Sequence, residues 1–324
     1  MLIDSYGRKI DYLRISVTDR CNLRCIYCMP QAGIIHKPQS KLLSFEEIAR
    51  VVEIMSALGV EKIRLTGGEP LLRKGVVDLV KSLSGIKGIS DISMTTNGIL
   101  LKEYASALKQ AGLKRLNISL DSLHQERYSL VTRQGKLERV LEGIEQAQNA
   151  GISPIKINVL LLDGMSVDEI MDFLRVSIEN SLHVRFLEFM PVNSFYKIDN
   201  FISARDVIDI ARKCFALEDA AIYGNGPAEV FKIKNALGTF GVISPMSSKF
   251  CFKCNRLRLS SDGFLKPCLH SELKMNLRVL LRSSASDDDL AEVIKSAAAE
   301  KPKEHNLDKG EFLFSDYSMC QIGG

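Results

Sequence analysis

Apolar and polar residues alternate in several short segments, and longer segments between them repeat their apolar positions with a period near 3.6 residues. The first pattern is typical of half-buried strands, and the second of amphipathic helices. The predicted strands span residues 12–17, 62–66, 89–95, 115–120, 155–161 and 184–189. The predicted helices span residues 45–58, 76–83, 102–110, 137–149 and 167–179. Ser44 and Glu47 form a predicted capping box at the start of the first helix.

Strands that alternate with helices imply right-handed βαβ units around a parallel sheet. Six such units predict an α/β fold, a partial (open) TIM-type (βα)6 barrel rather than a closed barrel of eight strands. The alternation of predicted strands and helices ends after Pro191, where residues 192–200 resemble a linker. A helix is predicted at 204–213 and a hairpin from 256–260 and 264–268. We therefore expect a barrel at residues 1–191 and a smaller C-terminal α+β region at residues 192–324.

Composition narrows the function classes. A hydrophobic content of 46% is enough for a sizeable core, and the net charge of +4 is too small to favour nucleic acid as a partner. The N-terminal segment MLIDSYGRKIDYLRIS has no apolar signal core, and the chain has no apolar run of about 18 residues. We expect a cytoplasmic protein with no membrane partner. Disulfides are uncommon in that compartment, so clustered cysteines favour metal binding.

Three cysteines stand close together in the segment DRCNLRCIYCMP, which follows the first predicted strand. Cys21, Cys25 and Cys28 have a C-x-x-x-C-x-x-C spacing, with Tyr27 before the last cysteine. Three thiolates can hold three corners of a cubane iron–sulfur cluster and leave the fourth iron without a protein ligand. An open metal position is typical of a reactive site. A redox thiol set or an incomplete zinc site is the alternative, but the full pattern after a strand favours a cluster.

This spacing resembles the radical S-adenosylmethionine (SAM) superfamily, in which SAM binds the open iron and is cleaved to methionine and a 5′-deoxyadenosyl radical. LTGGEPLLR at residues 65–73, TTNG at residues 95–98 and the terminal Gly323-Gly324 extend the resemblance. Together they resemble one family, the GTP 3′,8-cyclases of molybdenum cofactor biosynthesis. The resemblance runs almost the full length of the chain.

Several motifs follow successive predicted strands, whose C-terminal ends form the active-site rim of α/β barrels. The Gly67-Gly68-Glu69-Pro70 loop is a weak signal alone, because a glycine pair after a strand often marks only a turn. It lacks the spacing of a dinucleotide loop or a P-loop. The resemblance implies that this loop receives the amino group of SAM. The implied SAM contacts are Tyr27, Gly68, Glu69, Ser119 and Met190.

A second cysteine group lies in KFCFKCNRLRLSSDGFLKPCLH, at residues 249–270. Cys251, Cys254 and Cys268 again supply three thiols. His270 could complete a Cys3His structural zinc site, although a C-x-H ligand pair is tighter than the usual finger spacing. The resemblance implies instead a second [4Fe–4S] cluster, whose open iron contacts the guanine of GTP.

A triphosphate calls for several converging cations. The usual fate of Lys and Arg is a solvated surface position, and a cation inside a barrel wall needs a partner. The resemblance implies that GTP is bound by Arg14, Arg64, Thr95, Lys156, Arg185, Arg256 and Arg258, with Lys62 as a further candidate. We also expect the tail Gly323-Gly324 to insert into the barrel and to support substrate binding. Cys214 and Cys320 are isolated, which predicts packing roles.

The chain is thus predicted to be an enzyme that uses two [4Fe–4S] clusters and SAM. It would convert GTP to (8S)-3′,8-cyclo-7,8-dihydroguanosine 5′-triphosphate by ribose 3′ hydrogen abstraction and attack on guanine C8. The resemblance implies an external electron donor of the flavodoxin or ferredoxin type and, as next enzyme, cyclic pyranopterin monophosphate synthase, and it allows a homodimer. One alternative is another twin-cluster radical SAM enzyme that modifies a peptide. Another is a zinc or iron–sulfur nucleic-acid-binding regulator, for which the low charge and 7% aromatic content supply no basic face.

Overall fold

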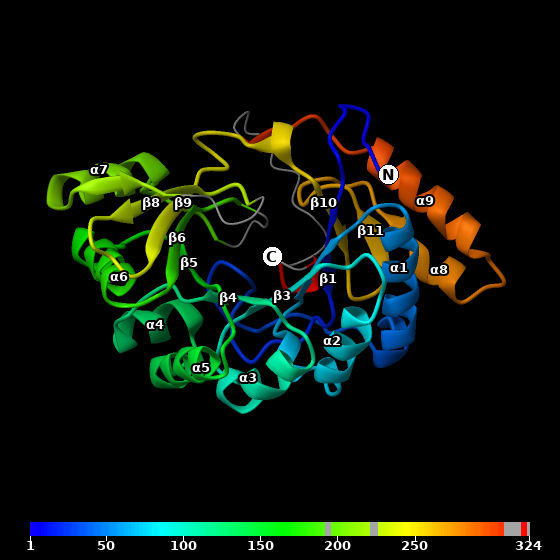
Figure 1. Ribbon diagram of the computed structural model, residues 1–324, viewed down its shortest axis with the longest axis horizontal. Coiled ribbons are helices and arrows are strands. Elements are labelled where there is room, and N and C mark those ends of the chain that lie inside the picture. Colours follow the sequence, from blue (N-terminus) through cyan, green and yellow to red (C-terminus); the bar gives the residue numbers. More distant parts are fainter. Residues whose placement is uncertain (192–195, 221–225, 308–318, 323–324) are drawn as a thin grey trace.

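The computed structural model describes residues 1–191, 196–220, 226–307 and 319–322 (Figure 1). The expectation for the tail Gly323-Gly324 lies outside the described residues, as do residues 192–195 of the predicted linker. Within the described ranges, no helix combines the length and the apolar character needed to cross a membrane.

One curved sheet organises the fold, and over the described residues it has twelve strands (Figure 1). In sheet order these are β12 (Met275–Asn276), β11 (Phe264–Lys266), β10 (Arg256–Leu259), β1 (Tyr12–Ser16), β2 (Lys62–Thr66), β3 (Asp91–Thr96), β4 (Arg115–Ser119), β5 (Ile155–Leu161), β6 (His183–Glu188), β9 (Thr239–Ile243), β8 (Glu229–Ile233) and β7 (Leu217–Asp219). The run from β10 through β1–β6 to β9 is parallel, and antiparallel strands continue it at both edges.

Helices cover the convex side of this sheet (Figure 1). The helices of the described residues are α1 (Phe45–Ala57), α2 (Val76–Ser84), α3 (Leu101–Gln110), α4 (Gln125–Thr132), α5 (Leu137–Asn149), α6 (Val167–Glu179), α7 (Ala204–Cys214), α8 (Leu277–Leu281), α9 (Asp287–Ala299) and α10 (Met319–Ile322). Short 3-10 turns within the same ranges are η1 (Gln39–Lys41), η2 (Pro70–Leu72) and η3 (Cys251–Lys253). The short α10 differs from the others, because it lies inside the curve of the sheet, next to β1 (Figure 1).

The prediction of an α/β fold built on an open, partial barrel is confirmed, and the six predicted barrel strands are β1 to β6. The predicted hairpin is also present, as β10 and β11. The structure adds two parallel strands that the six-unit count omitted. β10 pairs with β1 and β9 pairs with β6, so the second half of the chain extends both edges of the barrel sheet. The division at residue 191 stays a prediction.

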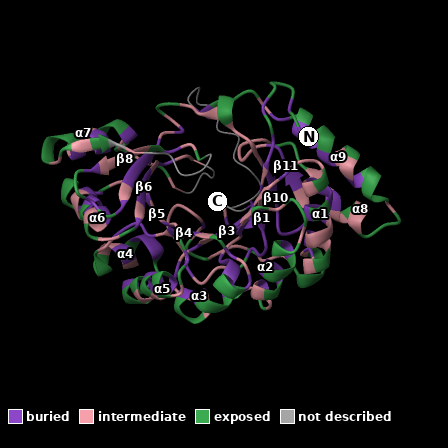
Figure 2. Cartoon of the chain, viewed as in Figure 1, coloured by how far each residue is buried: buried purple, intermediate pink, exposed green. Residues whose placement is uncertain are grey.

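Alternating burial explains why the strands present polar residues to the concave side. In β1, Leu13 and Ile15 are fully buried in the core, while Tyr12 and Arg14, which alternate with them, are only half-buried. Figure 2 shows the same contrast on a larger scale, with buried strands inside and exposed outer helix faces. Burying one such aliphatic side chain contributes roughly 1.5–3 kcal/mol, so the alternation holds the apolar face against the helices. The opposite face is left to line the interior.

The predicted capping box at the start of α1 is confirmed. The backbone N–H of Glu47 donates to the Ser44 hydroxyl at 3.1 Å, and the Ser44 N–H donates to the Glu47 carboxylate at 2.7 Å. These bonds satisfy two donors that a helix start otherwise leaves without a partner.

Candidate active site

The first cysteine loop leaves the C-terminal end of β1 and packs directly against the glycine loop after β2. The backbone N–H of Gly68 donates to the Thr18 carbonyl, and that of Glu69 donates to the Arg20 carbonyl, both at 2.8 Å. A Cβ on Gly68 would lie 2.1 Å from the Arg20 oxygen. No other residue type fits there without movement of the cysteine loop. The close approach that glycine permits is therefore an approach between these two loops.

Glu69 joins the glycine loop to the TTNG motif after β3. Its carboxylate is fully buried and accepts hydrogen bonds from the Thr96 hydroxyl at 2.8 Å and from the Asn97 N–H at 2.7 Å. Burial raises the pKa of Glu69 to about 7, although these bonds oppose the rise. The Asn97 side chain continues the chain of contacts, since it donates to Asn22 at 2.8 Å and lies 3.9 Å from the Cys21 sulfur. The structure thus brings the cysteine, GGEP and TTNG motifs together.

The end of β4 reaches the same loop through a buried carboxylate. The Tyr27 hydroxyl donates to Asp121 at 2.7 Å, and the Leu160 N–H donates to the other carboxylate oxygen at 2.9 Å. Burial raises the pKa of Asp121 to about 6. Ser119 ends β4 two residues earlier, and Met190 follows β6, so both lie at C-terminal strand ends. Sequence analysis did not assign a role to Asp121.

The three thiols of the first group are half-buried, and none is in a disulfide. Burial raises the pKa of Cys21 to about 12 and that of Cys25 well above its usual value. For Cys28 the largest cause of the raised pKa is a hydrogen bond with Cys320, followed by burial. Cys320 lies on α10 and is buried, so it packs against a candidate ligand, whereas Cys214 is exposed. Iron binding at this group must displace protons.

The spacing of the thiols bears on the kind of metal group they can hold. Within the part of the chain that the structure describes, no three His, Cys, Asp or Glu side chains are placed to hold one metal ion. Thiolates on one zinc ion, each about 2.3 Å from the metal, would lie roughly 3.8 Å apart. The ligands of a cubane bind separate irons and stand farther apart. Each cysteine group supplies three free thiols, the number that a cubane with one open iron requires.

The second cysteine group lies at the opposite end of the strands. Cys254 precedes β10 by two residues and Cys268 follows β11 by two, while Cys251 begins η3. Because β10 runs parallel to β1, this position is the N-terminal end of the barrel strands, whereas the first group follows their C-terminal ends. The five residues of β1 span about 13 Å at roughly 3.3 Å per residue. The two groups therefore face the interior from its two ends.

A buried lysine connects the two segments that carry the second group. Lys301 is 3% exposed, and its ammonium donates to the carbonyls of Arg256 at 2.8 Å and Pro267 at 2.7 Å. Burial raises the pKa of the Cys254 thiol, but the cations Arg256 and Lys301 outweigh burial and bring this pKa down to about 6. A thiolate, the form that binds metal, is thus already favoured at Cys254 near neutral pH.

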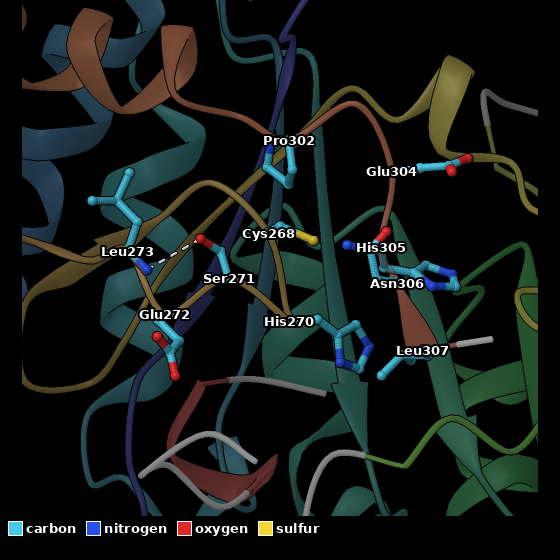
Figure 3. Close-up of a pocket in the computed structure, with 10 residues that line it drawn as sticks. All are labelled: Cys268, His270, Ser271, Glu272, Leu273, Pro302, Glu304, His305, Asn306 and Leu307. Carbon is cyan, nitrogen blue, oxygen red and sulfur yellow. Dashed lines mark hydrogen bonds between the residues drawn. The ribbon is translucent and has the colours of Figure 1, made fainter. Parts of the chain in front are cut away.

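A cavity of about 320 Å³ adjoins the second group. Figure 3 shows segments 268–273 and 302–307 facing each other across it. Its lining residues are Cys268, His270, Ser271, Glu272, Leu273, Pro302, Glu304, His305, Asn306 and Leu307. The His270 ring lies 5.8 Å from that of His305, and burial lowers the pKa of His270 to about 3, so the ring is neutral. The cavity gives the second group room for a ligand.

Cations line the interior between the two groups. Arg14 of β1 stands opposite Arg64 of β2 and Arg258 of β10 in the parallel register. Lys156 of β5 and Arg185 of β6 continue this wall, with Asn117 and Asn158 as their cross-strand neighbours. All six cations expected at the GTP site, together with Thr95, lie on these adjacent strands. Arg115 on β4, which pairs with Asp91, is a further cation that sequence analysis omitted.

The cations of this wall repel one another, and this repulsion lowers the pKa values of their side chains. Burial, then the neighbouring Arg185 and Arg115, lower the pKa of Lys156 to about 7. Burial and Arg64 lower the pKa of Arg185 to about 9. Lys62 is better compensated, because it forms an ion pair with Asp11 at 2.9 Å. An anionic ligand in this interior would relieve the repulsion.

Arg185 and Thr95 each have a buried polar atom in this wall that could bond to a ligand. The Arg185 Nη2 donates to Asn117 and Asn158 at 2.6 Å each. Over the described residues, its Nε and the Thr95 hydroxyl are buried without a hydrogen-bond partner. A buried polar group without a partner costs free energy, so both atoms favour a polar ligand.

The chain is similar over its whole length to known proteins. Residues 15–176 match the model of the Radical SAM superfamily, and residues 182–307 match the model Molybdenum Cofactor Synthesis C. The GTP 3′,8-cyclase of Peptoclostridium acidaminophilum is 47% identical over 327 residues, which cover 100% of this chain and 98% of that protein. The chain belongs to the radical SAM superfamily, and within it to the GTP 3′,8-cyclase family.

Another family member is similarly close, and a solved structure shares the fold. The GTP 3′,8-cyclase of Petrotoga mobilis is 46% identical, with 100% of both chains covered. Streptococcus suis SuiB, in its structure with the precursor peptide SuiA, has a TM-score of 0.65 at 17% identity and covers 98% of this chain and 70% of that one. This likeness supports the fold alone. Membership of the radical SAM superfamily implies a [4Fe–4S] cluster and SAM.

Proposed function

We propose that the chain is a GTP 3′,8-cyclase that catalyses the first step of molybdenum cofactor biosynthesis. The product would be (8S)-3′,8-cyclo-7,8-dihydroguanosine 5′-triphosphate. One observation carries the proposal: two cysteine groups face a cation-lined interior from its opposite ends. That interior suits a ligand that has an anionic end for the cations and an uncharged, reactive end that lies between the two cysteine groups. A peptide substrate, the alternative, would not call for so many converging cations.

The first cysteine group, Cys21, Cys25 and Cys28, holds the cluster that binds SAM. When bound, this cluster and SAM supply the 5′-deoxyadenosyl radical that removes the ribose 3′ hydrogen. Tyr27, Gly68, Glu69, Ser119 and Met190 hold SAM in this proposal. The carboxylate of Glu69 already accepts hydrogen bonds from the TTNG segment. Its role is therefore to fix the glycine loop, whose backbone faces SAM.

The interior cations hold the triphosphate and orient the ribose. The proposed GTP contacts are Arg14, Arg64, Thr95, Lys156, Arg185, Arg256 and Arg258. Charge-assisted hydrogen bonds to phosphate are stronger than neutral ones, so the crowded cations of the wall become favourable once the anion is present. A substrate held along its whole length leaves little freedom at C3′ and C8, which must meet for ring closure.

The second cysteine group, Cys251, Cys254 and Cys268, holds a second [4Fe–4S] cluster that faces the guanine. Arg256 and Arg258 beside the thiols, and the C-x-H spacing of Cys268 and His270, which is tighter than the usual zinc-finger spacing, support iron over zinc. An electron donor of the flavodoxin or ferredoxin type, cyclic pyranopterin monophosphate synthase as the next enzyme, and a homodimer stay predictions. The role of Gly323-Gly324 is also a prediction. A chain that lacks both glycines should keep its iron but lose the cyclisation of GTP.

The test uses protein reconstituted with iron and sulfide under anaerobic conditions. With a reductant, SAM and GTP deuterated at C3′, we expect deuterium in 5′-deoxyadenosine and one cyclised nucleotide per SAM cleaved. Deuterium-free 5′-deoxyadenosine would contradict the proposed hydrogen abstraction. About eight irons per chain are expected, and about half should remain after Cys21, Cys25 and Cys28 are replaced by Ala. Four irons plus one zinc that is lost in His270→Ala would assign the second group to zinc.

A further inference from the structure

The first cysteine loop has a second support, which no motif in the sequence marks. Residues 24–29 lie outside every helix and strand, yet they bond to the end of α4. The Arg24 N–H donates to the Thr132 carbonyl at 3.1 Å, and the Ile26 N–H donates to the Val131 carbonyl at 2.9 Å. These two donors flank Cys25. The loop therefore continues the hydrogen bonding of a helix that belongs to a different βα unit.

This use of α4 follows from the way helices end. The last carbonyls of a helix have no intrahelical partner, so they need water, a cap or another segment. At the end of α4, Val131 and Thr132 are buried residues. Their backbone carbonyls accept hydrogen bonds from N–H groups of the cysteine loop. The helix end and the loop thus satisfy each other's backbone groups. The position of Cys25 depends on where α4 stops.

Arg133, the residue at which α4 stops, has an unusual backbone. Its φ is 63°, in the left-handed region, where residues with a Cβ are uncommon. Across the described ranges, Asn235 is the one other non-glycine residue with positive φ. Asn tolerates this region and Gly prefers it, whereas Arg has no such tendency. Such a conformation persists when contacts around the residue hold it in place.

The contacts of the Arg133 side chain show what holds it. Its Nη1 donates to the carbonyls of Arg24 and Met29, both at 3.2 Å. These residues stand immediately before Cys25 and immediately after Cys28. One nitrogen atom therefore ties together the two ends of the Cys25–Cys28 turn. Within that turn, the N–H groups of Cys28 and Met29 already donate to the Cys25 carbonyl.

We propose that Arg133 is a positioning residue for the first iron–sulfur cluster, because its guanidinium fixes the span between Cys25 and Cys28. The proposal rests on these cysteines being the cluster ligands. Its positive charge also lies beside a site that becomes anionic when thiolates bind iron, and net charge is one of the factors that set cluster potentials. Arg24 acts in the same way within the loop, since its own guanidinium donates to the Cys21 and Leu23 carbonyls at 2.8 and 2.9 Å.

A purely structural role as the C-cap of α4 makes the opposite prediction. Gly is the preferred residue at a left-handed helix end, so Arg133→Gly should then leave the protein equally or more stable and the loop unchanged. If Arg133 positions the loop, Arg133→Gly loosens it even though the backbone strain is relieved. Arg133→Lys keeps a donor and the charge, so it should recover part of the effect. Asn235→Gly relieves the same backbone conformation far from the cysteines and serves as the matched control.

Two measurements apart from catalysis test the proposal. In the apoprotein, hydrogen exchange of the amides of residues 24–29 should be faster by about five- to tenfold in Arg133→Gly, the size expected for losing an ordinary hydrogen bond. In reconstituted enzyme, a chelator should remove the iron that depends on Cys21, Cys25 and Cys28 faster by a similar factor. Asn235→Gly should match the wild type in both, and Arg133→Lys should fall between.

Equal exchange and equal iron loss in Arg133→Gly and wild type would overturn the proposal. If the wild-type protein held no iron that depends on Cys21, Cys25 and Cys28, the ligand assignment would fall, and the proposal with it. The two failures are distinguishable, because the first leaves the cluster in place. Electron paramagnetic resonance of the reduced enzyme gives a further check. The SAM-dependent change of the first cluster's signal should be smaller in Arg133→Gly and unaltered in Asn235→Gly.

Discussion

Lys156 should make GTP binding depend on pH in a way that the structure specifies. Burial lowers its pKa from 10.5 to about 7, and Arg185, Arg115 and Arg64 add to the effect. At pH 7 about half of the unliganded molecules therefore carry a neutral Lys156. A bound triphosphate favours the charged form and raises the pKa again. GTP binding above pH 7 is then accompanied by proton uptake.

The magnitude follows from linkage. At pH 8, one unit above the pKa of the free enzyme, about nine in ten unliganded molecules have lost the proton, so binding should take up about 0.9 proton. Each further pH unit should weaken GTP binding by up to tenfold, or about 1.4 kcal/mol, until the pKa of the complex is reached. At pH 6 the uptake from Lys156 should be about 0.1 proton. His183, whose pKa is lowered by burial and by Lys156, is neutral at pH 8 and adds nothing.

Isothermal titration calorimetry in two buffers of different ionisation enthalpy measures this uptake directly. The matched control is Lys156→Arg, which keeps the charge but does not lose its proton in this pH range. It should bind GTP with an uptake of only about 0.1 proton at pH 8, the share of Arg185, and with a pH profile that is nearly flat between pH 6 and pH 8. An uptake near zero in the wild type, or the same uptake in Lys156→Arg, would refute the reasoning.

Three further substitutions test other contacts. Gly68→Ala places a Cβ 2.1 Å from the Arg20 carbonyl and should displace the first cysteine loop, so that about half of the iron is lost in elemental analysis while the second group keeps its share; full iron content would contradict this reading. Lys301→Met removes the cation that joins the two segments of the second cysteine group. Elemental analysis should then show the loss of the half of the iron that this group holds. Denaturant titration should show a free energy of unfolding lower by roughly 1–3 kcal/mol. Cys320→Ala should keep the full iron content and SAM cleavage, since Cys320 contacts Cys28 without being a required ligand; a loss of iron would make it one.

Most of the fold could be predicted because its signals are local. The alternation in β1 to β6 and the amphipathic helices between them follow from one buried face per element. The strand β9 and the pairing of the predicted strand β10 with β1 could not be found in this way. β9 and β10 join the sheet through parallel pairing with β6 and β1, and pairing between segments so far apart in sequence leaves no local pattern. The helix α4 was missed because its eight residues are too few to establish a period.

The candidate site likewise has parts that local sequence patterns predict and parts that they do not. Cysteine spacing and loop motifs are local, and they identified both cysteine groups. Asp121, Lys301 and Arg133 act instead by contacting backbone or side chains of other segments. Lys301 binds the carbonyl of Arg256, 45 residues away, and Arg133 binds that of Arg24, 109 residues away. Only the folded chain brings such pairs together, so no spacing rule applies to them.

The interior also explains why such supports are needed. A barrel wall of buried cations opposes folding in the absence of an anion, because each charge is desolvated and repelled by its neighbours. The apolar face of the same strands, with residues such as Leu13 and Ile15 packed under the helices, has to hold the wall together until the ligand arrives. The cysteine loops at the two ends lie outside that packed face. They depend on single buried or bridging side chains, Asp121 and Arg133 at one end and Lys301 at the other, and these contacts hold the loops where the barrel core cannot.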